Sequence, residues 1–305
     1  MRTLIHVGTR GSALALAQTN EVIELLSKRI PSVRYQVVVI KTEGDKLHES
    51  GESTMDSKSV FTKEIEESLV KNEIQIAVHS MKDLTSALPR GLVIAAVPPR
   101  ADHRDALISH DKRKFDQLQA GASVGTSSPR RKTQLLAARS DLKIVDMRGN
   151  VDTRLRKLEA GDYDAIVVAA AGLVRLGLEK RATELLSTKV MLPAIGQGAV
   201  AVECREEDDE VLSILSSIED KATRKAVEAE RAFARKLGAN CRTPIAAYAR
   251  FHDGELAIDA MIASPDGRML LRSQLTSDNP DSRKVGEELA ESLLEKGGQL
   301  ILETT

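Results

Sequence analysis

Aromatic residues are scarce in this chain: among 305 residues there are no tryptophans, three tyrosines and four phenylalanines. Proteins that bind single-stranded nucleic acids usually stack the bases on aromatic side chains, so this scarcity argues against that class. Long hydrophobic runs are also missing, and none approaches the ~18 apolar residues of a membrane span. The opening MRTLIHVGTRGS is too short and polar for a signal peptide. We therefore expect neither nucleic-acid nor membrane partners.

Cysteine is equally rare. The two cysteines, Cys204 and Cys241, make neither a disulfide framework nor a zinc site, and His79 has no companion set of metal ligands. We expect free thiols in a reducing cytoplasmic compartment, and no metal. The formal net charge is -1, so any anion-binding site must be a local cluster of basic residues.

The remaining composition is that of an ordinary globular protein, with 42% hydrophobic and 29% charged residues. The length predicts two or three domains. Strand-like and helix-like segments alternate along the first two thirds of the chain, which predicts mostly parallel sheets covered by helices. The first series comprises strands at 4–7, 35–41, 74–78 and 92–97, with helices at 13–29 and 61–71. The second comprises strands at 106–108, 123–124, 143–147 and 165–170, with helices at 129–139 and 151–160.

The rest of the chain changes character. A further apolar strand at 199–204 is followed by helices at 208–217 and 222–237. An antiparallel meander is expected over 245–275, with turns at Asp253-Gly254 and Asp266-Gly267, and a helix over 282–296 closes the chain. This predicts a separate α+β domain. The polar stretch 47–59 reads equally well as a solvated loop or as a lid.

Several arginines occupy positions that a helix dipole disfavours. Arg10 precedes the expected cap Ser12, and Arg130 and Arg131 fall in the first turn after Ser128. Arg148 and Arg154 flank the expected cap Asn150 in the same way. A single such arginine is usually a solvated surface residue, but three motifs of this kind indicate a site for a polyanion, because an anion at a helix N-terminus reverses the unfavourable interaction.

The segment HSMKD, residues 79–83, follows an expected buried strand. Residues just past the carboxyl end of a strand in an open α/β sheet point into the ligand crevice. Lys82 and Asp83 are therefore either a charge pair at a helix start, or a cation for substrate carboxylates beside a carboxylate for proton transfer.

Ten motifs together resemble the porphobilinogen deaminase family, through their order and spacing over most of the chain. They are GTRGSALALAQ (8–18), TEGD (42–45), KSVFTKEIE (58–66), AVHSMKD (77–83), GTSSPRR (125–131), RGNVDTRLRKL (148–158), AAAGLVRLGL (169–178), LPAIGQGA (192–199), AERAF (229–233) and NCRTPIAAYA (240–249).

The resemblance implies the fold and the domain boundaries. Two α/β domains resembling the lobes of type II periplasmic binding proteins are expected, plus a small α+β C-terminal domain. Domain 1 would comprise residues 1–98 with 199–216, domain 2 residues 103–194, and domain 3 residues 221–305. The chain would cross between the first two domains near Pro98-Pro99.

The resemblance also implies the activity and its cofactor. A transferase of this family joins four porphobilinogen molecules head to tail, with loss of ammonia, onto a covalent dipyrromethane primer, and releases hydroxymethylbilane for haem and other tetrapyrroles. Cys241 would carry the primer through a thioether, whereas Cys204 reads as a buried core thiol. Asp83 matches the catalytic carboxylate, and the protein is expected to act as a monomer.

Each porphobilinogen carries an acetate and a propionate, so the resemblance gives the misplaced cations a ligand. Binding of these carboxylates is implied for Arg10, Ser12, Lys82, Thr126, Ser128, Arg130, Arg131, Arg148, Arg154 and Arg175, with Lys58 and Gln18 as further contributors.

The sequence departs from the family pattern at Asn240, where glycine is usual before the cysteine, and at Thr85, where proline is common. Asparagine tolerates the left-handed backbone better than most residues, so the loop can keep its shape. The rival interpretation is a two-lobed anion-binding protein or effector domain without catalysis, which would give Cys241 no role.

Overall fold

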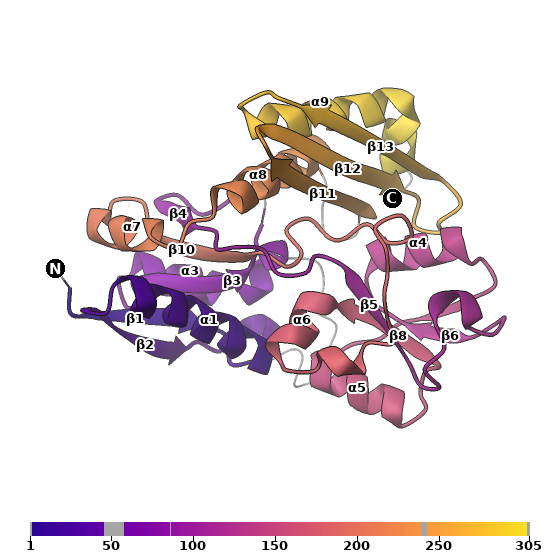
Figure 1. Ribbon diagram of the computed structural model, residues 1–305, viewed down its shortest axis with the longest axis horizontal. Coiled ribbons are helices and arrows are strands. Elements are labelled where there is room, and N and C mark those ends of the chain that lie inside the picture. Colours follow the sequence, from indigo (N-terminus) through magenta and orange to yellow (C-terminus); the bar gives the residue numbers. More distant parts are fainter. Residues whose placement is uncertain (1, 46–57, 86, 239–242, 304–305) are drawn as a thin grey trace. The chain divides into compact units, whose positions relative to one another are not determined.

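A computed structural model describes residues 2–45, 58–85, 87–238 and 243–303 of the chain (Figure 1). Cys241, Asn240 and the stretch 47–57 lie outside the described residues. The described residues divide into two compact units, Met1–Ala101 with Ala199–Arg224 (unit 1) and Asp102–Gly198 with Lys225–Thr305 (unit 2).

Unit 1 is built on a five-stranded sheet of order β2-β1-β3-β10-β4. β1 runs parallel to β2 and β3, whereas β10 is antiparallel to β3 and β4. One face packs against α1 and α7, through Val22 and Leu26 of α1, and the other packs against α3 through Ile65 and Leu69. The bounds are β1 Leu4–Thr9, α1 Ala13–Arg29, β2 Arg34–Val39, α3 Lys63–Val70, β3 Ile76–Ser80, β4 Leu92–Ala96, β10 Val200–Arg205 and α7 Asp209–Ser216.

Unit 2 contains a second five-stranded sheet, of order β7-β6-β8-β5-β9. Alternate residues of β5 and β8 face opposite sides: Leu107 and Val167 pack with Leu135 of α4, and Ile108 and Val168 pack with α5 and α6. The bounds are β5 Asp105–Ser109, β6 Ser123–Gly125, α4 Pro129–Ala138, β7 Lys143–Val145, α5 Val151–Glu159, β8 Ala165–Ala169, α6 Ala170–Arg175 and β9 Glu184–Leu185.

The C-terminal part of unit 2 is an antiparallel three-stranded sheet of order β11-β12-β13 covered by helices (Figure 1). Phe233 of α8 and Leu289 of α9 pack on its inner face with Ile258. The bounds are α8 Lys221–Lys236, β11 Ile245–His252, β12 Glu255–Ala263, β13 Leu270–Ser277, α9 Ser282–Leu293, a π-helix Leu294–Gly298 and α10 Gln299–Glu303. The predicted fold class, two α/β sheets with a smaller α+β region, is confirmed. The three domain boundaries stay a prediction.

Local capping explains why three of the predicted helices begin where they do. The side chains of Ser12, Ser128 and Asn150 each accept a hydrogen bond from the backbone N–H three residues on, as expected for N-caps. Several predicted boundaries differ from the structure by a few residues. The strand predicted at 74–78 runs from Ile76 to Ser80, so His79 lies within it. The last predicted helix is interrupted by a kink, where Gly297 adopts a non-helical φ of 103°.

None of the helices that the structure describes is long and apolar enough to cross a membrane.

Candidate active site

A pocket in unit 1 brings together four of the predicted site residues. Arg10 and Ser12 at the start of α1, Gln18 on α1, and Asp83 after β3 all line it, together with His79. The sheet explains the convergence: β1 and β3 are parallel neighbours, so the segments that follow their carboxyl ends meet at one edge.

Asp83 lies in a 3-10 turn, Met81–Asp83, directly after β3. The backbone holds this turn in place, because Met81 N–H donates to the carbonyl of Ala199 at 3.0 Å and Leu84 N–H donates to that of Met81 at 3.3 Å. The Asp83 and Lys82 residues are both half-buried. A carboxylate and a cation therefore follow the end of the strand, and which of the two interpretations applies stays open.

Arg10 already has a carboxylate partner. Its guanidinium Nε and Nη2 donate to Oδ1 of Asp45 at 3.1 and 2.5 Å, and it stacks over the Phe61 ring at 4.2 Å. Burial alone would raise the pKa of Asp45. The hydrogen bonds from Arg10 and Thr42 and the positive charge of Arg10 outweigh this effect, so that the pKa of Asp45 is lowered. Asp45 therefore neutralises part of the charge of Arg10, and the role of Arg10 in binding a substrate carboxylate stays a prediction.

Two further polar side chains of the pocket, the N-cap Ser12 and Gln18 of α1, already accept hydrogen bonds within the protein. Ser12 caps the helix, accepting from Ala15 N–H at 3.2 Å, and keeps its own hydroxyl proton for donation. Gln18, only 3% exposed, accepts from Ser80 Oγ at 2.9 Å, which leaves its amide NH₂ as a donor. Both residues can therefore donate to a carboxylate placed in the pocket.

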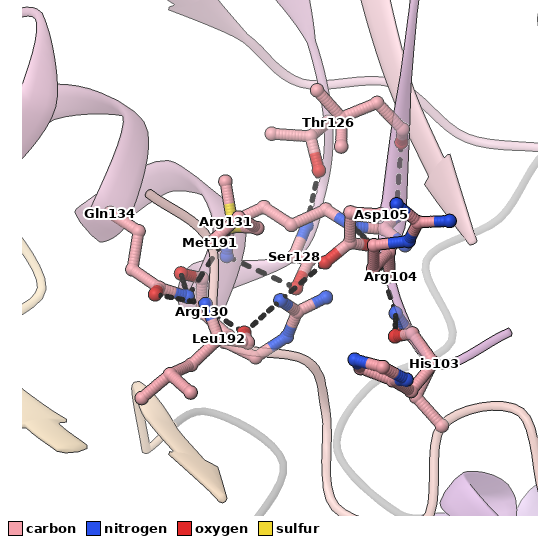
Figure 2. Close-up of polar contacts among 12 residues, drawn as sticks. His103, Arg104, Asp105, Thr126, Ser128, Arg130, Arg131, Gln134, Met191 and Leu192 are labelled. Atoms are coloured by element: carbon pink, nitrogen blue, oxygen red, sulfur yellow. Dashed lines mark hydrogen bonds and ion pairs between the residues drawn. The ribbon is translucent and has the colours of Figure 1, made fainter. Parts of the chain in front are cut away.

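The second cluster, in unit 2, surrounds the buried carboxylate of Asp105 (Figure 2). Arg131 donates to Oδ1 of Asp105 through Nε at 3.0 Å and Nη2 at 2.6 Å. Arg130 donates to Oδ2 at 2.7 Å and to the carbonyl of Leu192 at 2.6 Å. Nε2 of Gln197 also donates to Oδ1 of Asp105, at 3.1 Å.

The electrostatics of Asp105 follow from this geometry. Burial opposes ionisation, but the charges and hydrogen bonds of Arg130 and Arg131 outweigh it and lower the pKa of Asp105 from 3.8 to about 2. The two arginines at the start of α4 are thus held by an internal anion, and their binding of a ligand carboxylate stays a prediction. Sequence reasoning missed Asp105, whose only signal was an acidic residue at the start of a buried strand.

Arg154 carries the surplus charge of this cluster. Its partial burial, followed by the positive charge of Arg131, lowers the pKa of Arg154 to about 10. Its Nε donates to the carbonyl of Gly149 at 2.8 Å, and among the described residues it has no ion-pair partner. Asp146 attracts it at longer range but is itself paired with the exposed Arg148, at 3.5 Å. Four arginines against two aspartates leave a net positive site.

The remaining predicted residues lie in or near these elements. Thr126, 3% exposed, accepts from Ser128 N–H at 3.2 Å, and Arg175 at the end of α6 donates to the carbonyl of Gly198 at 3.2 Å. Lys58 begins a short 3-10 helix, Lys58–Phe61. Cys204 is fully buried in β10, as predicted, and burial with the negative charge of Asp208 raises the pKa of its thiol to about 12.

The surplus of cations in unit 2 fits a ligand that carries several carboxylates. Arginine forks bind carboxylates bidentately, and a helix N-terminus adds backbone donors. The N-terminal ends of α4 and α5 place Arg154 near the pair of arginines that hold Asp105, together with the hydroxyls of Thr126 and Ser128. The residues present therefore suit an acidic group such as a dipyrromethane bearing acetate and propionate chains.

Comparison with known proteins agrees with this chemistry. The family described as "Porphobilinogen deaminase, dipyromethane cofactor binding domain" matches residues 5–213, and "Porphobilinogen deaminase, C-terminal domain" matches residues 224–295. The proteins named porphobilinogen deaminase from Geobacillus sp. (strain WCH70) and Bacillus subtilis (strain 168) are 48% and 45% identical to this chain over 305 residues each, covering 99% of it and 97% and 96% of their own lengths.

Among solved structures, the probable amino-acid ABC transporter extracellular-binding protein ytmK from Bacillus subtilis is 12% identical over 72% of this chain and 90% of that chain, with a TM-score of 0.43. Because two family matches and full-length relatives at nearly half identity coincide, the chain belongs to the porphobilinogen deaminase family.

Proposed function

We propose that this protein joins four porphobilinogen molecules head to tail with loss of ammonia and releases hydroxymethylbilane. The full-length similarity to porphobilinogen deaminases is the observation that carries this assignment. A non-catalytic anion-binding role is not favoured, because the similarity extends through the C-terminal region that follows both α/β sheets.

The cofactor is a dipyrromethane, which supplies the free ring position that each incoming porphobilinogen extends. We assign its attachment to Cys241 through a thioether, because Cys204 is fully buried with a pKa of about 12 and is a poor nucleophile. Its carboxylates would be held by the cations of unit 2, with hydroxyls at the same helix ends. The residues are Arg130, Arg131, Arg148, Arg154, Arg175, Thr126 and Ser128.

Asp83 is the proposed catalytic carboxylate. Asp83 lies in the turn after β3. From there its carboxylate would accept a hydrogen bond from the pyrrole N–H of the bound substrate and would stabilise the positive charge that develops as ammonia leaves. Lys82, Ser12 and Gln18 would bind substrate carboxylates around it, with Lys58 as a further contributor. Arg10 would contribute less charge than an isolated arginine, because Asp45 already neutralises it.

We further propose a cytoplasmic monomer without nucleic-acid or membrane partners. The scarcity of aromatic residues and the formal net charge of -1 argue against a nucleic-acid partner.

Incubation of the purified protein with porphobilinogen tests the activity. Ammonia and linear tetrapyrrole should appear together, with four ammonia molecules for each tetrapyrrole. Binding of porphobilinogen without release of ammonia would instead identify an anion-binding protein.

A further inference from the structure

Three titratable side chains are buried together in unit 1, beside the pocket that contains Asp83. They are Glu66 on α3, His79 on β3 and Glu203 on β10, and their exposed fractions are 7%, 6% and 0%. Nε2 of His79 lies 3.2 Å from Oε2 of Glu203. The proposed mechanism uses none of the three.

Strand pairing explains how they meet. β10 runs antiparallel to β3 with Glu203 opposite Ala77, and His79 is two residues beyond Ala77 on the same face of the sheet. His79 and Glu203 are therefore diagonal neighbours. α3 covers this face through Ile65, which packs near Ala77, and brings the adjacent Glu66 within electrostatic reach of both groups.

A completed structural ion pair does not describe this cluster. Oε1 of Glu66, Nε2 of His79 and both carboxylate oxygens of Glu203 are buried without a hydrogen-bond partner among the described residues. Each unsatisfied buried group costs about 1–3 kcal/mol, so stability alone does not account for three of them in one place. Local rules broken beside a pocket are characteristic of functional groups.

The electrostatics of Glu66 follow from its burial and from the nearby carboxylate. Burial, followed by the negative charge of Glu203, raises the pKa of Glu66, and the nearby Thr62 hydroxyl and the charge of His79 only partly oppose this. No lysine or arginine among the described residues forms an ion pair with either glutamate. With no cation paired to either glutamate, a proton held between them would relieve the repulsion of two buried carboxylates.

The chemistry of chain extension, if the proposed function is correct, needs such a group. Each coupling breaks the C–N bond of one porphobilinogen, and ammonia leaves with the bonding electrons. A C–C bond forms, and the accepting ring carbon loses one proton. An amino group must carry a proton to leave as ammonia, so a group in the site that keeps the proton from one coupling can supply it to the next.

His79 is placed for this transfer, because it contacts Glu203 and also lines the same pocket as Asp83. Arg10 and Asp83 are the charged groups that line the pocket with it. We propose that Glu66, His79 and Glu203 form a proton store: His79 takes the proton released from the ring carbon, the two glutamates share it, and His79 gives it to the amino group of the next porphobilinogen, which then leaves as ammonia. Glu66 and Glu203 act through His79 and are positioning residues.

Kinetics of Glu66→Gln and Glu203→Gln test the store. Each should lower kcat about tenfold with KM nearly unchanged, and should move the pH profile of kcat by about one unit. Glu67→Gln is the matched control. Glu67 lies next to Glu66 on α3, but its side chain is exposed, with Oε2 at 3.8 Å from Nζ of the exposed Lys71. It should behave as the wild type. A merely structural role would lower stability without moving the pH profile.

Infrared spectroscopy of the substrate-free protein gives a second reading that does not depend on turnover. The wild type and Glu67→Gln should show a protonated carboxylic acid at neutral pH, and Glu66→Gln should lose it. Absence of that band in an active wild type, or an unchanged pH profile in both glutamine variants, would overturn the store. Failure of the proposed function would appear differently, as a wild type that releases no ammonia from porphobilinogen.

Discussion

Replacing Asp105 by asparagine removes the buried anion that holds Arg130 and Arg131. The change preserves the shape of the side chain but leaves two nearly buried guanidinium groups, each 6% exposed, without a counter-charge. The pKa of Asp105 lies at about 2 instead of 3.8, which at ~1.4 kcal/mol for each unit corresponds to roughly 2–2.5 kcal/mol of stabilisation. Breaking a buried ion pair costs up to about 5 kcal/mol, which sets the upper bound.

Thermal unfolding followed by circular dichroism measures this loss. At about 2–4 °C for each kcal/mol, the midpoint of Asp105→Asn should fall by roughly 4–20 °C. Both proteins should carry Cys241→Ser, so that differences in cofactor loading do not contribute. Asp102→Asn is the matched control, because Asp102 pairs with the half-exposed Arg104 and should cost less than about 1 kcal/mol.

Acid provides an independent check on the same carboxylate. Because the pKa of Asp105 is lower in the folded protein than its ordinary 3.8, its contribution is fully present above that pH and disappears as the pH falls toward about 2. The difference in midpoint between wild type and Asp105→Asn should therefore shrink over that range. An Asp105→Asn midpoint within about 2 °C of the wild type at neutral pH would refute the reasoning, since it implies that the pair adds less than about 1 kcal/mol.

Four further variants separate chemistry from stability. Asp83→Ala should keep its circular dichroism spectrum but lose ammonia release by about 10²–10⁴-fold, because a half-buried carboxylate at a turn contributes little to the core; near-normal release would exclude the catalytic role. Arg148→Leu and Arg131→Leu should both impair assembly of the cofactor, but only Arg131→Leu should also lower the unfolding midpoint, since Arg148 makes just an exposed 3.5 Å pair. Equal midpoints would contradict the structural distinction. Ser128→Ala should cost about 1 kcal/mol through loss of the α4 cap, and an unchanged midpoint would show that the cap is dispensable.

Local signals in the sequence were sufficient for most elements of the fold. The caps Ser12, Ser128 and Asn150 were predicted because a capping side chain acts on a backbone N–H only three residues away. The burial of Cys204 was predicted from the apolar strand around it. α6 was missed because it begins directly at the end of β8, and its N-cap Ala169 makes no side-chain hydrogen bond.

The internal partners of the site could not be predicted in the same way. Asp105 lies 25 residues from Arg130 in the chain, and Asp45 lies 35 residues from Arg10. Such pairs depend on strand order and on how a helix docks, which periodicity does not determine. The arginines were therefore found from their unfavourable positions at helix ends, whereas the carboxylates that compensate them appeared only in three dimensions.

We propose above all that this chain builds its product on a dipyrromethane attached to Cys241. Intact mass spectrometry of the purified protein tests it most directly. The wild type should exceed its sequence mass by one dipyrromethane, Cys241→Ser should show the sequence mass alone, and brief exposure to porphobilinogen should add further rings to the wild type. A catalytically active wild type at its unmodified sequence mass, or the same added mass on Cys241→Ser, would contradict the account.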